Sequence, residues 1–258
     1  MLRTIVNGIS IAYERSGQGT PLVLLHGYPL DHSIWEPLVP WLEKGFDLIQ
    51  PDLRGFGESD SAGADCSMAD YAADLAGMLD HLGIQKAAVV GHSMGGYVAL
   101  EFAYSQKTRM LGLGLVASQA LADTAERKAA RFLEAEDILA HGVKAVAESM
   151  SGKLTAKPEL QIWLKELILR QRPEGLAGAV RAMAARPDST PRLSGFDFPM
   201  AVVHGLADAL IPVERARSVK AVVKHGHLVE IEGAGHMPMM EAPQATAEAL
   251  QAAFGLLR

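Results

Sequence analysis

The stretch KAAVVGHSMGGYVA, residues 86–99, decides the interpretation of the whole chain. Ala87–Val90 is a short apolar run ending in two valines, which indicates a strand buried in a parallel sheet. The G-x-S-x-G pattern GHSMG follows at residues 91–95, and residues 96–104 have the composition of a helix. A strand, a tight turn and a helix are the context in which this pattern presents a nucleophilic serine.

The glycines at positions 91 and 95 are explained by the turn itself. A turn this tight crowds its flanks, so the neighbours of a strained Ser93 must lack side chains. We expect Ser93 at the carboxyl end of its strand and at the N-terminus of a helix, where free N–H groups favour an anion. Without strand and helix, the same letters would describe a glycine-rich loop with an incidental serine.

Composition and charge exclude several classes of protein. With 258 residues, 49% of them hydrophobic, the chain suits one large α/β domain with an insertion. A net charge of -6 argues against a nucleic-acid partner, which requires a basic face. We find no apolar segment long enough to span a membrane and no signal-peptide core near the N-terminus. Because the single Cys66 cannot form an internal disulfide, we expect a cytoplasmic protein.

Short apolar strands alternate with helices along most of the chain. The N-terminal strands 2–6 and 9–14 join at Asn7-Gly8, a dipeptide that favours a two-residue hairpin. Further strands are predicted at 21–25, 46–49, 110–117, 198–204 and 227–231, and helices at 33–44, 67–82, 212–222 and 243–257. This order predicts an α/β fold with a mostly parallel, doubly wound sheet of the eight-stranded type and an antiparallel N-terminal edge.

The alternation stops between residues 118 and 197, where no strand is indicated. Helical signals occur instead at 125–140, 143–150, 158–171 and 173–185. We therefore expect a core made of residues 1–117 and 198–258, with a helical cap inserted at 118–197. Apolar side chains of such a cap would roof an apolar pocket over Ser93.

Two other strand ends carry candidate partners for Ser93. A serine hydroxyl is a weak nucleophile until a base takes its proton, and that base needs an acid to orient it. Asp208 follows the predicted strand that ends at His204, and His236 follows the last strand. Each alone could be an ordinary turn residue. The order Ser93, Asp208, His236 is that of one hydrolase architecture, and not of the chymotrypsin or subtilisin types.

Together these motifs make the chain resemble the α/β-hydrolase fold superfamily, in its capped, esterase-like branch. The matching segments are HGYP at 26–29, DLRGFGES at 52–59, GHSMGG at 91–96, HGLAD at 204–208 and GAGHMPMMEAP at 233–243. The resemblance implies that Ser93 is the nucleophile, His236 the general base and then acid, and Asp208 the residue that fixes the imidazole tautomer. It also implies an oxyanion hole made by the backbone N–H groups of Tyr28 and Met94.

A serine at position 93 restricts the reactions that this resemblance implies. Haloalkane dehalogenases and epoxide hydrolases of the fold have Asp at the nucleophile position, so Ser93 points to acyl transfer. We expect hydrolysis of carboxylic esters of small to medium hydrophobic substrates through an acyl-enzyme, without cofactor or metal. The alternatives are an enol-lactone or C–C bond hydrolase, a perhydrolase with the same triad, and a small-molecule receptor with slow turnover. The residues predicted to line the pocket are His32, Trp35, Trp163 and Met237.

Other polar residues receive structural interpretations. His26 is expected to shape the oxyanion loop, Asp52 and Arg54 to pair within their own loop, and Glu241 to anchor the loop of His236. A cap arginine would suit the carboxylate of an enol-lactone. Candidates include Arg127, Arg131, Arg170, Arg172 and Arg181, but the sequence favours none of them. The natural substrate and the oligomeric state stay open.

Overall fold

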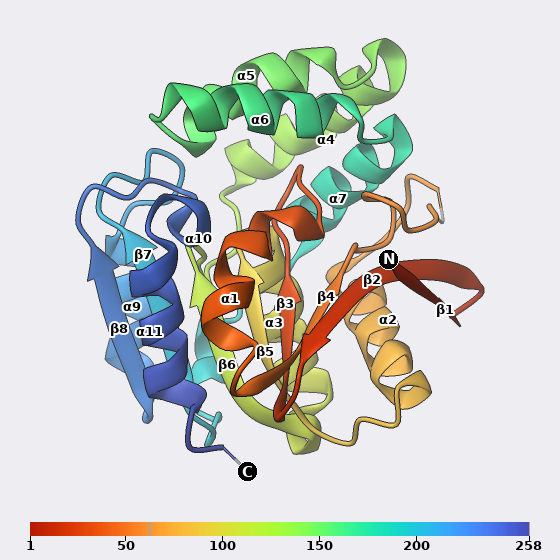
Figure 1. Cartoon of the computed structure of the whole chain (residues 1–258). Coiled ribbons are helices and arrows are strands. Elements are labelled where there is room, and N and C mark those ends of the chain that lie inside the picture. The colour runs from red at the N-terminus through yellow and green to blue at the C-terminus, as the bar shows by residue number, and fades with distance from the viewer. Residues whose placement is uncertain (62, 258) are drawn as a thin grey trace.

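An eight-stranded sheet forms the centre of the computed structural model, which describes residues 1–61 and 63–257 (Figure 1). The strands lie in the order β1-β2-β4-β3-β5-β6-β7-β8. The pairings β1–β2 and β2–β4 are antiparallel, whereas all the others are parallel. The bounds are β1 (Leu2–Val6), β2 (Ile9–Gly17), β3 (Thr20–Leu25), β4 (Phe46–Pro51), β5 (Ala87–His92), β6 (Met110–Val116), β7 (Met200–Gly205) and β8 (Gly226–Ile231). The predicted fold class is confirmed.

The antiparallel edge begins at the predicted hairpin. Asn7 and Gly8 have φ values of 49° and 81°, the left-handed pair that a tight hairpin turn requires. β2 continues to Gly17, beyond the predicted end at residue 14, because its second half pairs with β4 from Tyr13 opposite Pro51 onward. The extension therefore depends on a strand whose paired residues lie thirty or more positions away in the chain.

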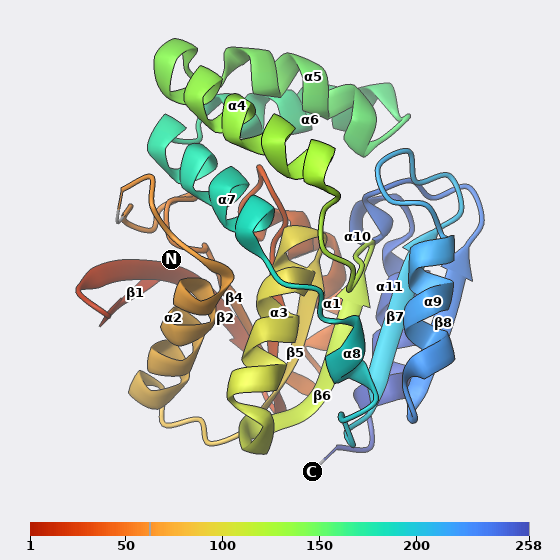
Figure 2. The same ribbon diagram turned by 180° about the vertical axis from the view of Figure 1, so that it is seen from behind.

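Helices cover both faces of the sheet. α1 and α11 lie on one face (Figure 1), and α2, α3 and α9 lie on the other (Figure 2). A capping box opens α2 at the start of the helix predicted over 67–82, since the Ser67 hydroxyl accepts from the Asp70 amide and the Asp70 carboxylate from the Ser67 amide. The bounds are α1 (Val39–Leu42), α2 (Met68–His81), α3 (Met94–Ser105), α9 (Glu214–Val222), α10 (Pro238–Glu241) and α11 (Pro243–Phe254).

The single helix predicted over residues 33–44 is wrong. The chain forms a 3₁₀ segment, η1 (His32–Leu38), followed by the short α1. Pro37 and Pro40 lack the N–H groups that a continuous α-helical ladder needs, so the hydrogen-bond pattern changes between them. This segment packs inward, and the Trp35 side chain is completely buried in the core.

Four helices form a layer above the sheet edge where the parallel strands end (Figure 1). They are α4 (Ala125–His141), α5 (Lys144–Leu154), α6 (Pro158–Leu169) and α7 (Pro173–Ala185). The short α8 (Thr190–Leu193) lies lower, packed against α9 (Figure 2). The division into a core and a cap at 118–197 stays our proposal, and residues 62 and 258 of the predicted core lie outside the described residues.

One apolar core runs from the sheet into this helical layer. Ile138 of α4 and Leu164 of α6 belong to the same buried cluster as Leu24 of β3 and Val90 of β5. The helical layer is therefore docked by continuous packing against the sheet. Among residues 1–61 and 63–257, no helix combines the length and apolarity needed to cross a bilayer.

Candidate active site

Ser93 occupies a strained turn between β5 and α3. Its φ of 49° and ψ of −113° lie outside the regions that side chains favour. A Cβ on Gly91 would lie 2.1 Å from the carbonyl oxygen of Gly95, and one on Gly95 would lie 2.4 Å from that of Leu25. The Ser118 hydroxyl donates to the Ser93 carbonyl at 2.7 Å and holds the turn from β6. Close packing of backbone thus explains both glycines, as predicted.

Gly95→Ala is expected to lower the free energy of unfolding by about 3 kcal/mol, because backbone carbonyls of Leu25 and His26 occupy the space of the added methyl group. Gly152→Ala is the matched control. Gly152 lies on α5 with nothing near its would-be Cβ, so alanine there should stabilise the protein by about 0.5–1 kcal/mol. Urea denaturation of both variants tests this, and equal effects would contradict the role assigned to Gly95.

His236 and Asp208 are joined at the carboxyl ends of β7 and β8. Asp208 Oδ2 lies 2.8 Å from His236 Nδ1 and 3.3 Å from His204 Nε2. Asp208 Oδ1 accepts from the amides of Leu210 and Ile211. Burial by itself would raise the pKa of Asp208, but hydrogen bonds from His204 and His236 outweigh it and hold that pKa well below its usual value. An ionised carboxylate only accepts, so Nδ1 of His236 carries its hydrogen and Nε2 is the basic nitrogen.

Two backbone N–H groups are unused beside this site. Met94 is the first residue of α3, and Tyr28 follows β3. Neither amide donates a hydrogen bond to any residue that the structure describes. Helix-initial amides have no partner within their helix and favour an anion. The arrangement is compatible with the predicted oxyanion hole, which stays a prediction.

Two buried histidines hold the surrounding loops. His26 Nε2 accepts from the Leu53 amide at 2.9 Å, and its Nδ1 bonds to the Gly27 carbonyl at 3.0 Å. His92 Nε2 donates to the His236 carbonyl at 2.8 Å, and a Cβ on Gly27 would lie 2.5 Å from His92 Nδ1. Burial lowers the pKa of both imidazoles, so both are neutral. They link the loops around Ser93.

A cavity of about 300 Å³ lies beside Ser93 and His236. Its remaining lining combines apolar, polar and charged side chains: Tyr28, Tyr97, Gln119, Asp123, Arg127, Arg131, Glu134, Met150, Lys153, Met183, Leu210 and Ile211. The lining is more polar than the apolar pocket predicted from the cap sequence. The charged members come from ordinary positions of amphipathic helices, so no signal in the sequence separates them from surface residues.

None of the four residues predicted to line the pocket is among the described residues that line this cavity. Trp35 and Met237 are completely buried in the core. Trp163 packs against the outer part of that core from α6. The His32 ring and amide both bond to Asp52, at 2.7 and 2.9 Å. Those predictions are wrong because apolar spacing does not tell which neighbour a side chain meets.

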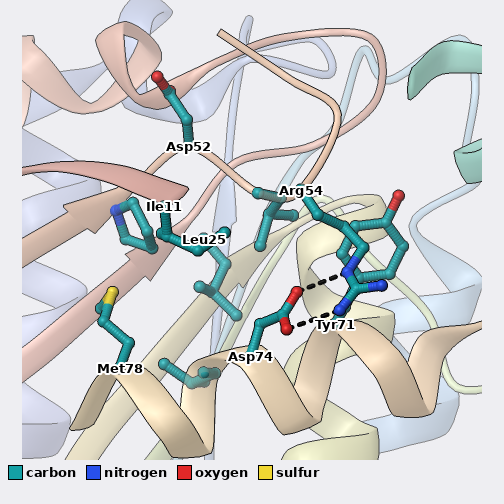
Figure 3. A pocket seen from close by; sticks show the side chains of 10 residues that line it. Ile11, Leu25, Asp52, Arg54, Tyr71, Asp74 and Met78 are labelled. Atoms are coloured by element: carbon teal, nitrogen blue, oxygen red, sulfur yellow. Dashed lines mark hydrogen bonds and ion pairs between the residues drawn. The ribbon is translucent and has the colours of Figure 1, made fainter. Parts of the chain in front are cut away.

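The predicted pairing of Asp52 with Arg54 is also wrong. Arg54 forms a two-pronged ion pair with Asp74 of α2, at 2.5 and 2.6 Å (Figure 3). Asp52 instead accepts from His32 and from the Glu58 amide. The hollow that Figure 3 views from close by, lined by Asp52, Arg54 and Asp74 among others, has a volume of about 10 Å³, too little for a substrate. Helix α2 supplies a carboxylate that loop sequence alone cannot predict.

Asp31, His32 and Asp52 bring three ligand atoms within 4.8 Å of one another. Their acceptor atoms are engaged, since Asp52 accepts from His32 and Asp31 accepts from the Ser33 amide. Burial disfavours the protonated imidazole, but the hydrogen bond to Asp52 and the negative charges of Asp52 and Asp31 together outweigh this and raise the pKa of His32. A metal needs the neutral ring. We assign the cluster to holding the loops after β3 and β4.

Comparisons with known proteins agree with the fold described above. A family model of the alpha/beta hydrolase fold matches residues 20–243. A thermophilic esterase from Thermogutta terrifontis, solved with malate bound, has 38% sequence identity and a TM-score of 0.92, covering 97% of this chain and 95% of its own. A pimeloyl-[acyl-carrier protein] methyl ester esterase of Aeromonas hydrophila is 28% identical over 269 residues, covering 94% of this chain and 98% of its own.

A soluble epoxide hydrolase of Corynebacterium sp. is 39% identical over 105 residues. That match covers 41% of this chain and only 37% of the epoxide hydrolase. The esterases among the relatives confirm the prediction of a hydrolytic enzyme. With a family match that spans most of its length, this chain belongs to the alpha/beta hydrolase fold family.

Proposed function

We propose that this protein is a serine carboxylic-ester hydrolase with Ser93, His236 and Asp208 as its catalytic triad. One observation carries the proposal: Ser93 and His236 line the same cavity, while the far side of the His236 ring is bonded to Asp208. This bond leaves Nε2 of His236 as the nitrogen that can take a proton from the serine.

The reaction follows from these positions. Ser93 Oγ attacks the ester carbonyl carbon while His236 Nε2 takes the hydroxyl proton, and the oxyanion that forms accepts from the amides of Tyr28 and Met94. Collapse of the tetrahedral intermediate breaks the bond to the alcohol oxygen, which receives the proton from His236. Water then repeats the sequence on the acyl-enzyme and releases the carboxylic acid. Asp208 stabilises the imidazolium in both steps.

Turnover of p-nitrophenyl esters over a range of acyl lengths tests this function. A burst of p-nitrophenol equal to the enzyme concentration, followed by steady hydrolysis, supports the acyl-enzyme. Hydrolysis of enol-lactones without ester turnover would favour the lactonase alternative. Binding without turnover of any ester or lactone would favour the receptor. The absence of a cofactor and the cytoplasmic location stay predictions.

We further propose that the preferred substrate carries a carboxylate beneath the cap. Arg127, Arg131 and Lys153 line the cavity together with only two carboxylates, Asp123 and Glu134. Asp123 is shared by two arginines, Arg131 at 2.5 Å and Arg186 at 2.8 Å, and Glu134 lies 3.9 Å from Arg127. The charged side chains that line the cavity therefore carry a net positive charge. Malate, bound by the Thermogutta esterase, is itself a dicarboxylate. This charge also favours a lactone that bears a carboxylate.

The double variant Arg127→Ala/Lys153→Ala removes two cations from the cavity. We expect its KM for p-nitrophenyl hemisuccinate to rise about tenfold, because a charge-assisted hydrogen bond is lost. KM for the neutral p-nitrophenyl butyrate should stay within about twofold. Arg170→Ala is the matched control, since Arg170 is an exposed cap cation outside the cavity lining. Equal changes for the two esters would contradict a carboxylate site.

A further inference from the structure

The backbone of His236 is held partly by the cap. Its N–H donates to the carbonyl of Leu154, the last residue of α5, at 3.2 Å. Its own carbonyl accepts from His92 Nε2 at 2.8 Å, and its ring bonds to Asp208. Of these three supports, one comes from the end of β5, one from the loop after β7 and one from the helical layer above the sheet.

A second connection joins the same two parts of the molecule through a carboxylate. Glu241 accepts with one oxygen from the amide of Gly235, the residue before His236, and with the other from the Thr155 hydroxyl. Thr155 follows directly after α5. Lys157 adds a third contact, because its Nζ donates to the Glu241 carbonyl at 3.0 Å. The segment at the end of α5 is thus bonded to His236 directly and to Glu241, which in turn holds the Gly235 amide.

The Thr155–Glu241 hydrogen bond is enclosed and closely packed, which fixes its geometry. The Thr155 side chain is enclosed, with only 2% of the residue exposed, and the side-chain Nε2 of Gln161 on α6 donates to the Thr155 carbonyl at 2.8 Å. A Cβ on Gly235 would lie 3.3 Å from both Glu241 oxygens, so this carboxylate is packed closely against the loop backbone. Hydrogen bonds to an ionised carboxylate are stronger than neutral ones, and enclosure strengthens them further.

We propose that Thr155 and Glu241 are positioning residues through which the docked cap fixes the catalytic orientation of His236. This inference rests on the proposed function, in which His236 is the general base. A cap that lifts takes the Leu154 carbonyl and the Thr155 hydroxyl with it, and the His236 loop loses both supports. Efficient proton transfer is therefore confined to the state in which the cap is docked.

Thr155→Val tests the proposal, because it removes the hydroxyl and keeps the shape of the side chain. We expect kcat to fall about 10–100-fold, the cost of a misplaced catalytic group, while KM stays within about twofold. Thr155→Ser should restore kcat. Thr246→Val is the matched control, since Thr246 is a buried threonine whose hydroxyl has no partner among the described residues. Rates are expressed per active site, counted by labelling with an organophosphonate.

The downfield region of the proton NMR spectrum gives a readout that needs no substrate. The hydrogen between His236 Nδ1 and Asp208 should give a resolved signal in the wild type, which Thr155→Val broadens or shifts and Thr155→Ser retains. Glu241→Gln, which replaces an acceptor by a donor, should have the same effects. Because Thr155 and Glu241 act as a unit, the double variant should be no slower than the worse single variant.

A Thr155→Val enzyme with wild-type kcat per labelled site and an unchanged signal would overturn the proposal, even if its melting temperature fell. If the wild type hydrolyses neither esters nor lactones but its NMR signal still depends on the Thr155 hydroxyl, the proposed function fails while the positioning role stands. The two failures are therefore distinguishable.

Discussion

Ser93→Ala is expected to lower kcat for ester hydrolysis about a million-fold, the cost of losing a nucleophile from a triad. Alanine keeps the Cβ and loses only the oxygen that forms the acyl bond, so the strained turn is preserved and the fold persists. The measurement combines ester turnover with mass spectrometry after treatment with an organophosphonate ester. We expect one adduct on Ser93 in the wild type and none in the variant.

A matched serine variant serves as the control for a general loss of structure. Ser218 lies exposed on α9, away from the cavity lining, and Ser218→Ala should label and turn over like the wild type. An unlabelled Ser93 in an active wild-type enzyme, or an alanine variant that hydrolyses esters at the original rate, would refute the triad.

Asp208→Asn is expected to lower kcat about ten-thousand-fold. The asparagine oxygen can still accept from the amides of Leu210 and Ile211, so the loop keeps its shape. Its NH₂ group then faces His236 and favours the tautomer whose Nδ1 accepts. In that tautomer Nε2 carries the hydrogen and cannot take the serine proton. Kinetics with p-nitrophenyl esters, at saturating and at low substrate, measures the loss.

The same variant should show a pH-dependent loss of stability. Hydrogen bonds from His204 and His236 outweigh burial and hold the pKa of Asp208 well below that of the unfolded chain, about 3.9. A depressed pKa contributes stability that is present above about pH 5 and is lost as the pH falls through the folded value. The melting temperature of the wild type should therefore be higher than that of Asp208→Asn at pH 7, and the difference between the two should become smaller below about pH 4.

Asp197→Asn is the control for both measurements. Asp197 is exposed and pairs with Lys107 and Lys224 on the surface, where solvent and salt screen ion pairs so that they contribute little to stability. Activity of this variant should match the wild type. A loss at Asp208 of less than about tenfold in kcat would mean that His236 does not depend on this carboxylate.

Features that depend on a few neighbouring residues could be predicted from the sequence. The turn at residues 91–95 needs small flanks, and its glycines do meet backbone atoms. The capping box of α2 and the hairpin at Asn7-Gly8 are likewise local. The alternation of apolar strands and helices allowed the parallel sheet to be predicted, because parallel strands need crossover helices between them. The carboxyl ends of such strands converge, which is why Asp208 and His236 meet.

Only the tertiary structure decided which side chains meet across elements distant in the chain. Amphipathic spacing marked the helices between residues 125 and 185, but it could not tell that Lys153 faces the cavity while Trp163 packs on the core. The same holds for Arg54, which finds Asp74 on α2, and for Thr155, which finds Glu241. Local conformation is set by backbone sterics and neighbouring hydrogen bonds. Partners across the fold are set by how whole helices pack, and periodicity in one segment carries no information about the other.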